Sequence, residues 1–120
     1  MRDSLTREII RAFYTVYNEL GYGFLEKVYQ NAFEIELLES GLKFEREKKL
    51  AAYYGNHKVG NYRADFVVEN SVIVEIKAGA ELHIGAKFQT LNYVRLAQLP
   101  VGLVLFFGPI PTVKRVVNNY

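Results

Sequence analysis

The stretch that most constrains the fold is Val101 to Phe107, seven consecutive nonpolar residues that directly follow Pro100. It is far shorter than the ~20 apolar residues needed to cross a bilayer. A strand that is apolar at every position is best explained if both of its faces are buried. The stretch therefore predicts an inner strand of a sheet, with helices packed against both sheet faces.

Three segments carry apolar residues at steps of three and four, which is typical of amphipathic helices. The first two end at Gly21 and Gly41, and the third ends before Pro100, which lacks a backbone donor. The predicted helices are Ser4–Leu20, Phe24–Ser40 and Glu81–Leu99. Their predicted buried faces are Leu5, Ile9, Ala12, Phe13, Val16 and Leu20; then Leu25, Val28, Ala32, Ile35 and Leu38; then Phe88, Leu91, Val94 or Arg95, and Leu96.

From Leu42 onward the apolar period changes to two, which indicates strands. The predicted strands are Phe44 with Lys48–Tyr54, then Val59–Glu69, Val72–Ala78 and Val101–Phe107, and finally Thr112–Val117 at an edge. The order along the chain is ααβββαββ, with no repeat, linker or low-complexity segment. We therefore expect one domain over residues 1–120, of the α/β (α+β) class, with a mixed sheet of about five strands in three α/β/α layers.

Asp65, Glu75 and Lys77 interrupt otherwise apolar strands, which is costly unless these charges are paired or bind a cation. Glu75 and Lys77 share a face because side chains alternate along a strand. Asp65 joins them only if the connecting loop has an odd length. A three-residue loop, Glu69–Ser71, would place Asp65 opposite Glu75 and Arg63 opposite Lys77, whereas a two-residue turn would place Asp65 on the other face.

Two carboxylates opposed across a strand pair repel each other, so one of them is expected to hold a proton. A divalent cation would remove this conflict, and Mg²⁺ or Mn²⁺ prefers oxygen ligands together with water and substrate phosphate. The alternative is an ordinary charge cluster on a solvated sheet face. The valine-rich surroundings of Glu75 favour an inner strand and hence the metal site.

Four motifs follow one another along the chain: Gly23-Phe-Leu-Glu26-Lys-Val-Tyr29, Tyr62-Arg-Ala-Asp65, Val74-Glu75-Ile76-Lys77-Ala78 and Gln89-Thr-Leu-Asn92-Tyr93. At these residues the chain resembles the PD-(D/E)XK nuclease superfamily and, within it, the small GxxExxY family. The resemblance spans almost the whole sequence. It implies a restriction-endonuclease-like fold and a nuclease activity that has been predicted for the family.

The resemblance also implies residue roles. Asp65 and Glu75 would bind the metal, Glu26 would be a further acidic ligand, and the carbonyl of Ile76 would complete the shell. Lys77 would position the attacking water. The resemblance further implies that Gln89, with Asn92 or Tyr93, supports the site or contacts the substrate backbone; Arg63, Lys43, Arg46, Lys48, Lys49 and Arg95 are candidate phosphate contacts by charge alone.

Simpler explanations exist for several of these residues. Glu26 could be a first-turn acid that favours the positive end of its helix. Tyr29 and Tyr93 could be core residues, and Gln89 and Asn92 could be surface residues. His57 and His83, which lie near predicted loops, are expected to be solvated.

Composition narrows the functional hypotheses only slightly. The chain has no cysteine, which excludes disulfides, thiolate metal sites and a cysteine nucleophile. Its net charge of +2 is too small to argue for nucleic acid by itself. We expect a cytoplasmic Mg²⁺- or Mn²⁺-dependent nuclease, with DNA the favoured substrate, no membrane contact and a homodimer as a further hypothesis. The alternatives are an inactive nucleic-acid-binding module and a protein-interaction or assembly domain.

Overall fold

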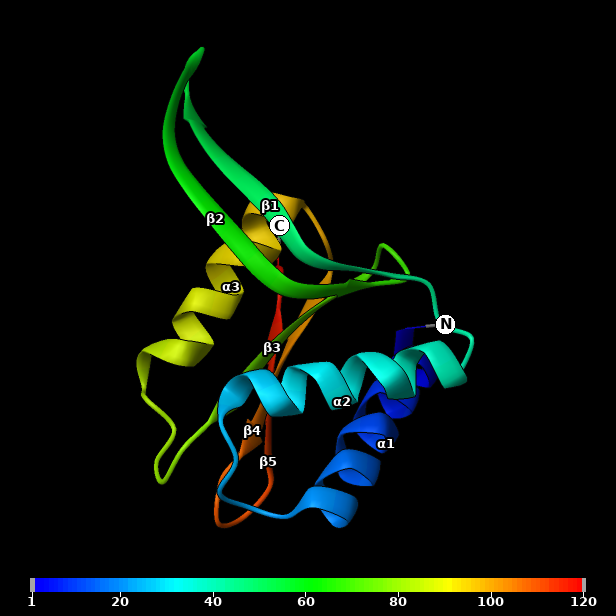
Figure 1. The fold of residues 1–120 in the computed structure, drawn as a ribbon. Coiled ribbons are helices and arrows are strands. Elements are labelled where there is room, and N and C mark those ends of the chain that lie inside the picture. Colours follow the sequence, from blue (N-terminus) through cyan, green and yellow to red (C-terminus); the bar gives the residue numbers. More distant parts are fainter. Residues whose placement is uncertain (1, 120) are drawn as a thin grey trace.

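The computed structural model describes residues 2–119, and these form three helices and a five-stranded sheet (Figure 1). The elements are α1 (Arg2–Leu20), α2 (Glu26–Glu39), β1 (Phe44–Tyr54), β2 (His57–Val68), β3 (Val72–Ala78), α3 (Gly85–Ala97), β4 (Val101–Phe107) and β5 (Thr112–Val117). The predicted order ααβββαββ is therefore confirmed. None of these helices is long and apolar enough to span a bilayer.

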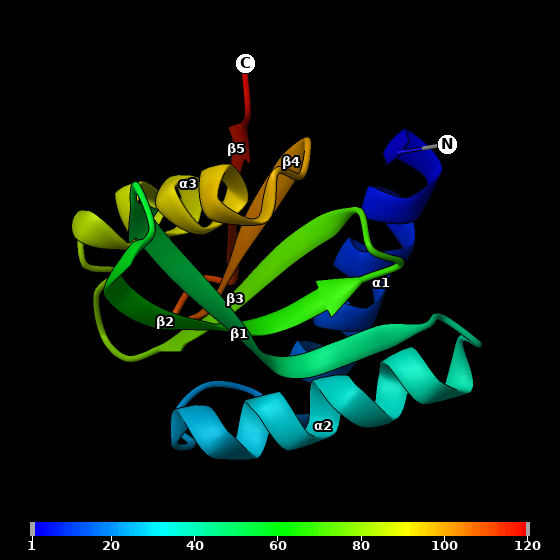
Figure 2. The same cartoon turned by 90° about the horizontal axis from the view of Figure 1, so that it is seen from above.

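The strands lie in the order β1-β2-β3-β4-β5, so β3 is the middle strand and β5 an edge strand, as predicted. β3 and β4 are parallel and are connected through α3, while the other neighbours are antiparallel. α1 and α2 cover one face of the sheet and α3 covers the other (Figures 1 and 2). All seven residues of β4 are buried, which confirms the three-layer prediction.

The layer between the sheet and the first two helices contains the larger core, in which aromatic rings dominate. Phe107 stacks on Tyr29 with ring centroids 4.1 Å apart, and Phe33 meets Phe66 edge to face at 5.1 Å. On α1 the predicted face is confirmed, since Ile9, Ala12, Phe13 and Val16 are buried there. The smaller core beneath α3 consists of Leu50, Ala64, Val67, Ile73, Tyr93, Val94 and Val116.

The predicted buried face of α2 was wrong. Tyr29, Phe33 and Leu37, at steps of four, are fully buried, and Ala32 only packs beside them. The helix carries apolar residues on several of its sides, so their spacing alone allows more than one buried face. The face with the aromatic rings is the one that buries the most area. The exposed members of the predicted face are Leu25, Val28, Ile35 and Leu38.

α3 is shorter than predicted, and its predicted face is confirmed in part, since Val94 is buried and Leu91 and Leu96 pack against the smaller core. It begins at Gly85 rather than Glu81, and Phe88, predicted to be buried, is 66% exposed. Besides Val94, the helix buries Ala86, Thr90 and Tyr93, which were not predicted. Two of these are small or polar residues. The hydroxyl of Thr90 donates to the carbonyl of Ala86 at 2.9 Å, so this polar side chain is hydrogen-bonded although it is buried. A pattern of apolar residues could not predict the burial of a threonine.

β1 and β2 form a long hairpin that curves away from the rest of the sheet, beside α3 (Figures 1 and 2). β1 pairs with β2 as far as Tyr54 and His57, whereas β2 pairs with β3 only over residues 66–68. The bend lies at Glu47, which has a positive φ of 54°. Phe44 packs into the larger core and Leu50 into the smaller one, so the strand changes its buried face between them.

Candidate active site

The predicted register of β2 and β3 is confirmed. Val68 lies opposite Val72, so the connection has three residues, and two of them, Glu69 and Asn70, have positive φ angles of 52° and 49°. This odd-length loop brings Asp65 of β2 beside Glu75 of β3. A turn one residue shorter would have shifted the alternation and directed Asp65 to the opposite face of the sheet.

Each of the two carboxylates accepts a backbone hydrogen bond from the opposite strand at the point where β2 and β3 separate. The backbone N–H of Asp65 donates to Oε2 of Glu75 at 2.7 Å. The backbone N–H of Ile76 donates to Oδ2 of Asp65, also at 2.7 Å. Each carboxylate thus takes the place of a carbonyl in the strand pairing, and its position is fixed by the backbone of the opposite strand.

The environment of this pair disfavours two negative charges. Burial, followed by the neighbouring charge of Asp65, raises the pKa of Glu75 to about 8. Burial also raises the pKa of Asp65, although the N–H of Ile76 and the ammonium of Lys77 act in the opposite direction. Burial and the charge of Asp65 therefore favour the protonated form of Glu75 when no cation is bound, in agreement with the expectation that one carboxyl of the pair is protonated.

Lys77 lies two residues after Glu75 on β3 and is held by α3. Its Nζ donates to Oε1 of Gln89 at 3.1 Å. Its positive charge lowers the pKa of Asp65, Glu75 and Glu26, so all three acids are close enough to interact with it. Lys77, Gln89 and Glu26 line a cavity of about 430 Å³ beside the carboxylate pair. The hydrogen bond from Lys77 thus places Gln89 beside the site, where the sequence analysis expected it.

Glu26 is the first residue of α2 and lies at the rim of this cavity. Partial burial raises its pKa, and the charge of Asp65 adds to the rise. The loop before it is held by Tyr29, whose hydroxyl donates to the carbonyl of Gly21 at 2.6 Å and accepts the N–H of Phe24 at 3.2 Å. Tyr29 is fully buried, so its role here is to position the start of the helix that carries Glu26.

The remaining predicted residues of α3 have different surroundings. Tyr93 is buried, and its pKa is raised by burial and then by the charges of Glu75 and Asp65. Its ring lies 5.9 Å from the ring of Tyr62 on β2. Tyr93 therefore borders the carboxylate pair. Asn92 is exposed on α3, and its proposed contact with substrate stays a prediction.

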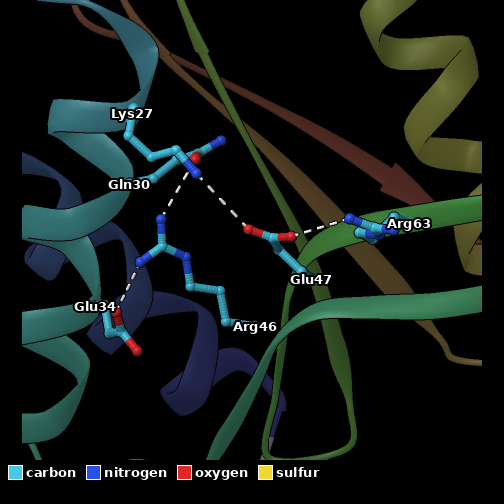
Figure 3. A network of polar contacts seen from close by, with 6 residues as sticks. All are labelled: Lys27, Gln30, Glu34, Arg46, Glu47 and Arg63. Atoms are coloured by element: carbon cyan, nitrogen blue, oxygen red, sulfur yellow. Dashed lines mark hydrogen bonds and ion pairs between the residues drawn. The ribbon is translucent and has the colours of Figure 1, made fainter.

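Arg63 does not lie opposite Lys77 as predicted, because the β2–β3 pairing ends at residues 66 and 74. It lies opposite Lys49 of β1 instead. Its Nη1 donates to Oε1 of Glu47 at 3.1 Å, and the other oxygen of Glu47 is 3.8 Å from Nζ of Lys27 on α2 (Figure 3). The guanidinium of Arg63 is therefore near the site but faces a second cavity.

This second cavity, of about 340 Å³, contains an acid that the sequence analysis missed. Glu47 lines it together with Asp65 and Glu26, and the charge of Glu47 raises the pKa of Asp65. The β1–β2 pairing continues on both sides of Glu47 and Asp65 but skips these two residues. A register counted from the hairpin turn at Tyr54 and His57 would have placed Glu47 opposite Ala64, and only the register shift between Ala52 and Tyr53 brings it opposite Asp65.

Arg46, a candidate phosphate contact, has a structural role. Its Nη1 donates to Oε1 of Glu34 at 2.7 Å, and its Nη2 reaches the side-chain oxygen of Gln30 at 3.5 Å (Figure 3). Its guanidinium carbon also lies 5.6 Å from the centroid of the Phe66 ring. These contacts connect α2 to the sheet. The guanidinium of Arg46 is thus paired within the protein, contrary to its predicted contact with a substrate phosphate.

The carboxylate pair fits a divalent cation with few protein ligands. Among the side chains that the structure describes, no group of three or more acidic or histidine residues is placed to hold a metal alone. Mg²⁺ is commonly bound by one or two carboxylates, with water and substrate phosphate completing its shell. One oxygen of Asp65 and one of Glu75 accept backbone N–H groups, and a cation would compensate the buried charge of the pair.

Comparison with known proteins agrees with this geometry. The family description "PD-(D/E)XK nuclease superfamily" matches residues 3–117. The chain belongs to this superfamily. The motif in its name corresponds here to Asp65 and to Glu75-Ile76-Lys77, with Ala64 in place of the proline. Ala64 is buried and pairs with Lys48 of β1.

Solved structures support the same fold for this PD-(D/E)XK domain. A structure titled "Crystal structure of SSO0001" superposes with a TM-score of 0.64 at 18% sequence identity. The superposition covers 78% of this chain and 51% of that one, so the present chain spans about half the length of its structural relative. At this identity the likeness shows a common restriction-endonuclease-like fold. No curated protein matches the sequence.

Proposed function

We propose that this domain is a divalent-metal-dependent nuclease that hydrolyses phosphodiester bonds of nucleic acid, with DNA the favoured substrate. One observation carries the proposal: Asp65 and Glu75 are interlocked on the middle strands, with Lys77 and Gln89 beside them. Membership of the nuclease superfamily gives the arrangement its chemical context. We also assign the chain to the GxxExxY group, on the motif Gly23, Glu26 and Tyr29.

Each residue of the site has a distinct part in the proposed reaction. A bound Mg²⁺ or Mn²⁺ would supply Lewis acidity and a water of lowered pKa. Asp65, Glu75 and the carbonyl of Ile76 would hold the ion, and Glu75 would release its proton when the ion binds. Glu26 would contribute a further acidic group from the cavity rim.

Lys77 would orient the attacking water and offset negative charge that develops on the phosphate. Its ammonium can do this because Gln89 restrains it at the wall of the cavity. Gln89 is thus a positioning residue that acts through Lys77. Tyr93, buried beside the carboxylates, would support the site, and Asn92 would contact the substrate backbone.

The first test is a calorimetric titration of Mn²⁺ into the wild-type domain and into Asp65→Asn. Asparagine retains an oxygen that can accept the N–H of Ile76, so the variant removes charge with little change in shape. We expect binding to the wild type that is lost in the variant. Glu81→Gln, at an exposed acid of the cavity lined by Lys77 and Gln89, is the matched control and should bind like the wild type. Equal affinity of wild type and Asp65→Asn would refute the site.

The second test measures cleavage of labelled DNA and RNA with Mg²⁺ or Mn²⁺. Lys77→Ala should reduce the rate by at least about 100-fold, the lower range for a positioned proton-transfer or charge-stabilising group. Lys114→Ala on β5 is the charge-matched control. Unchanged cleavage by Lys77→Ala would remove Lys77 from the mechanism. Sedimentation of the same samples checks for a homodimer, which would give one short chain more surface for a long duplex.

A nucleic-acid-binding domain without turnover is the second candidate. It is favoured by residues 48–63, which contain four lysines and arginines and no acid. This candidate predicts salt-dependent binding of nucleic acid, no heat on addition of Mn²⁺ and no cleavage by the wild type. The Mn²⁺ titration and the cleavage assay together therefore separate it from the nuclease.

A further inference from the structure

The positive charge of the chain is concentrated in the outer part of the β1–β2 hairpin. The whole chain has 15 lysines and arginines and 13 acids. Residues 48–63 contain four of these cations, Lys48, Lys49, Lys58 and Arg63, and no acid. The rest of the chain therefore has 11 cations and 13 acids and is net negative. The net charge of +2 understates how basic this one element is.

The basic segment has a hollow surface. A cavity of about 560 Å³ lies along it and is lined by Lys49, Lys58, Asn61, Tyr62 and Arg63. Three of these five residues are cations and none is an acid. This part of β2 lies beyond its pairing with β3, so the hairpin projects from the body of the domain (Figure 1). A cavity of this charge is complementary to the phosphates of a polyanion.

One face of the hairpin combines these cations with an exposed aromatic ring. Lys49 lies opposite Arg63, and Tyr53 lies opposite Lys58, and directly opposed residues share a face. Alternation along β1 places Lys49 and Tyr53 on that same face. Tyr53 is 64% exposed. On the opposite face Leu50 packs into the core beneath α3, so the face with Tyr53 is the outer one.

This outer face continues into the candidate active site. Arg63 lines both the hairpin cavity and the smaller cavity that contains Asp65 and Glu26. Lys58 and Asp65 are seven positions apart on β2, which corresponds to about 23 Å along a strand. An extended polyanion lying on the hairpin face would therefore reach the carboxylate pair without leaving the protein surface.

We propose that the outer face of the β1–β2 hairpin binds single-stranded nucleic acid and leads its backbone to the carboxylate pair. The inference rests on the proposed function and specifies its substrate class. Lys49 and Lys58 contact phosphates, Arg63 adds a contact beside its ion pair with Glu47, and the ring of Tyr53 stacks on a base. Stacking on an aromatic side chain requires a base that is not already stacked within a duplex, so the exposed tyrosine favours a single strand.

The test measures the anisotropy of labelled oligo(dT) and oligo(U) of about ten nucleotides, within the range of single-strand sites. Chelator replaces divalent ions, so binding is measured without cleavage. Tyr53→Ala should weaken binding about ten-fold. Lys58→Ala removes one phosphate contact, so the slope of log binding constant against log salt concentration should become shallower by about 0.7. The matched controls are Tyr54→Ala, an exposed tyrosine adjacent in β1, and Lys114→Ala on β5. Both should leave affinity unchanged.

The two oligomers distinguish DNA from RNA, and tighter binding of either one than of a duplex of equal length supports the proposal. Equal loss from Tyr53→Ala and Tyr54→Ala, or tighter binding of the duplex, overturns it. Failure of the proposed nuclease would appear differently, as binding that depends on Tyr53 without metal-dependent cleavage. Cleavage that is unaffected by Tyr53→Ala and Lys58→Ala would leave the nuclease intact and remove the hairpin surface.

Discussion

Glu75 has only 2% of its surface exposed and accepts a backbone N–H from the neighbouring strand. Its carboxyl is thus fixed in place while its charge is disfavoured by burial and by Asp65. An ionised carboxylate in such a place destabilises the fold when it has no counter-charge, and a bound cation would compensate its charge. The same residue therefore links the metal chemistry of the site to the stability of the domain.

The first prediction concerns this link. In the unfolded chain Glu75 ionises near its ordinary pKa of 4.5, whereas the folded domain retains the proton up to about pH 8. Between these values the folded state binds more protons, so its free energy of unfolding falls as pH rises, by at most about 1.4 kcal/mol per pH unit from this group. This stability is fully present below about pH 4.5 and is lost above about pH 8.

Urea unfolding in chelator across this pH range tests the prediction. Glu75→Gln keeps an acceptor for the N–H of Asp65 but does not ionise, so its free energy of unfolding should change much less with pH. Asp65, whose pKa is raised in the same direction, accounts for a residual slope. Identical pH dependence in the wild type and in Glu75→Gln would contradict the assignment of the shift to Glu75.

At the scale of elements, α2 shows how a helix with apolar residues on several sides is oriented by its partners. Tyr29 and Phe33 point to the sheet because Phe107 and Phe66 offer them ring contacts. The choice has a functional consequence, since the orientation of α2 also decides that Glu26 faces the cavity with Lys77. The helix therefore combines a structural face and a site residue within one turn.

The second prediction compares two substitutions on α2. Phe33 is fully buried, so Phe33→Ala should lower the free energy of unfolding by about 3–5 kcal/mol, through lost burial and a cavity. Ile35 is 54% exposed, so Ile35→Ala should change it by less than about 1 kcal/mol. Chemical denaturation measures both. Comparable losses would indicate that the helix is rotated from the orientation described above, or that Ile35 is covered by a partner.

The β2–β3 connection shows a second element-scale effect, because a loop remote from the site sets its geometry. Glu69 and Asn70 adopt positive φ angles and give the loop its odd length. Removing one residue would change which side chains of β2 face β3's carboxylate. The site therefore depends on backbone conformation in a turn that carries no catalytic group.

For the whole molecule, metal binding and folding should be coupled. A cation held by Asp65 and Glu75 binds only the folded domain, because the two residues come together through strand pairing. At a Mn²⁺ concentration of about 100 times the dissociation constant, the stabilisation should be about 2.7 kcal/mol. For a domain of this size that corresponds to a rise in Tm on the order of ten degrees.

Thermal unfolding with and without Mn²⁺ measures this third prediction. Asp65→Asn should show no metal-dependent rise, and Glu81→Gln should rise like the wild type. A rise of equal size in Asp65→Asn would mean that the ion acts elsewhere on the protein. Ca²⁺ serves as an additional probe, because its larger shell requires more oxygen ligands than the pair provides.

The sequence by itself determined the order of elements, the loop parity and the identity of the acidic pair. These follow from short-range patterns, because alternation and turn length are properties of neighbouring residues. Asp65, Glu75 and Lys77 could be grouped before any coordinates because a three-residue loop fixes which side chains share a face. The buried positions of α1 and β4 were likewise evident from spacing.

Tertiary structure alone decided the orientation of α2, the exposure of Phe88 on α3, the place of Arg63, and the proximity of Glu47 to the site. Helix orientation depends on which rings the opposing strands present, and Phe107 and Phe66 are remote in sequence from α2. Arg63 and Glu47 depend on the bend in the hairpin, where a positive φ interrupts the pairing. Local patterns cannot specify these features, because their energies arise from contacts between segments that meet only in the folded chain.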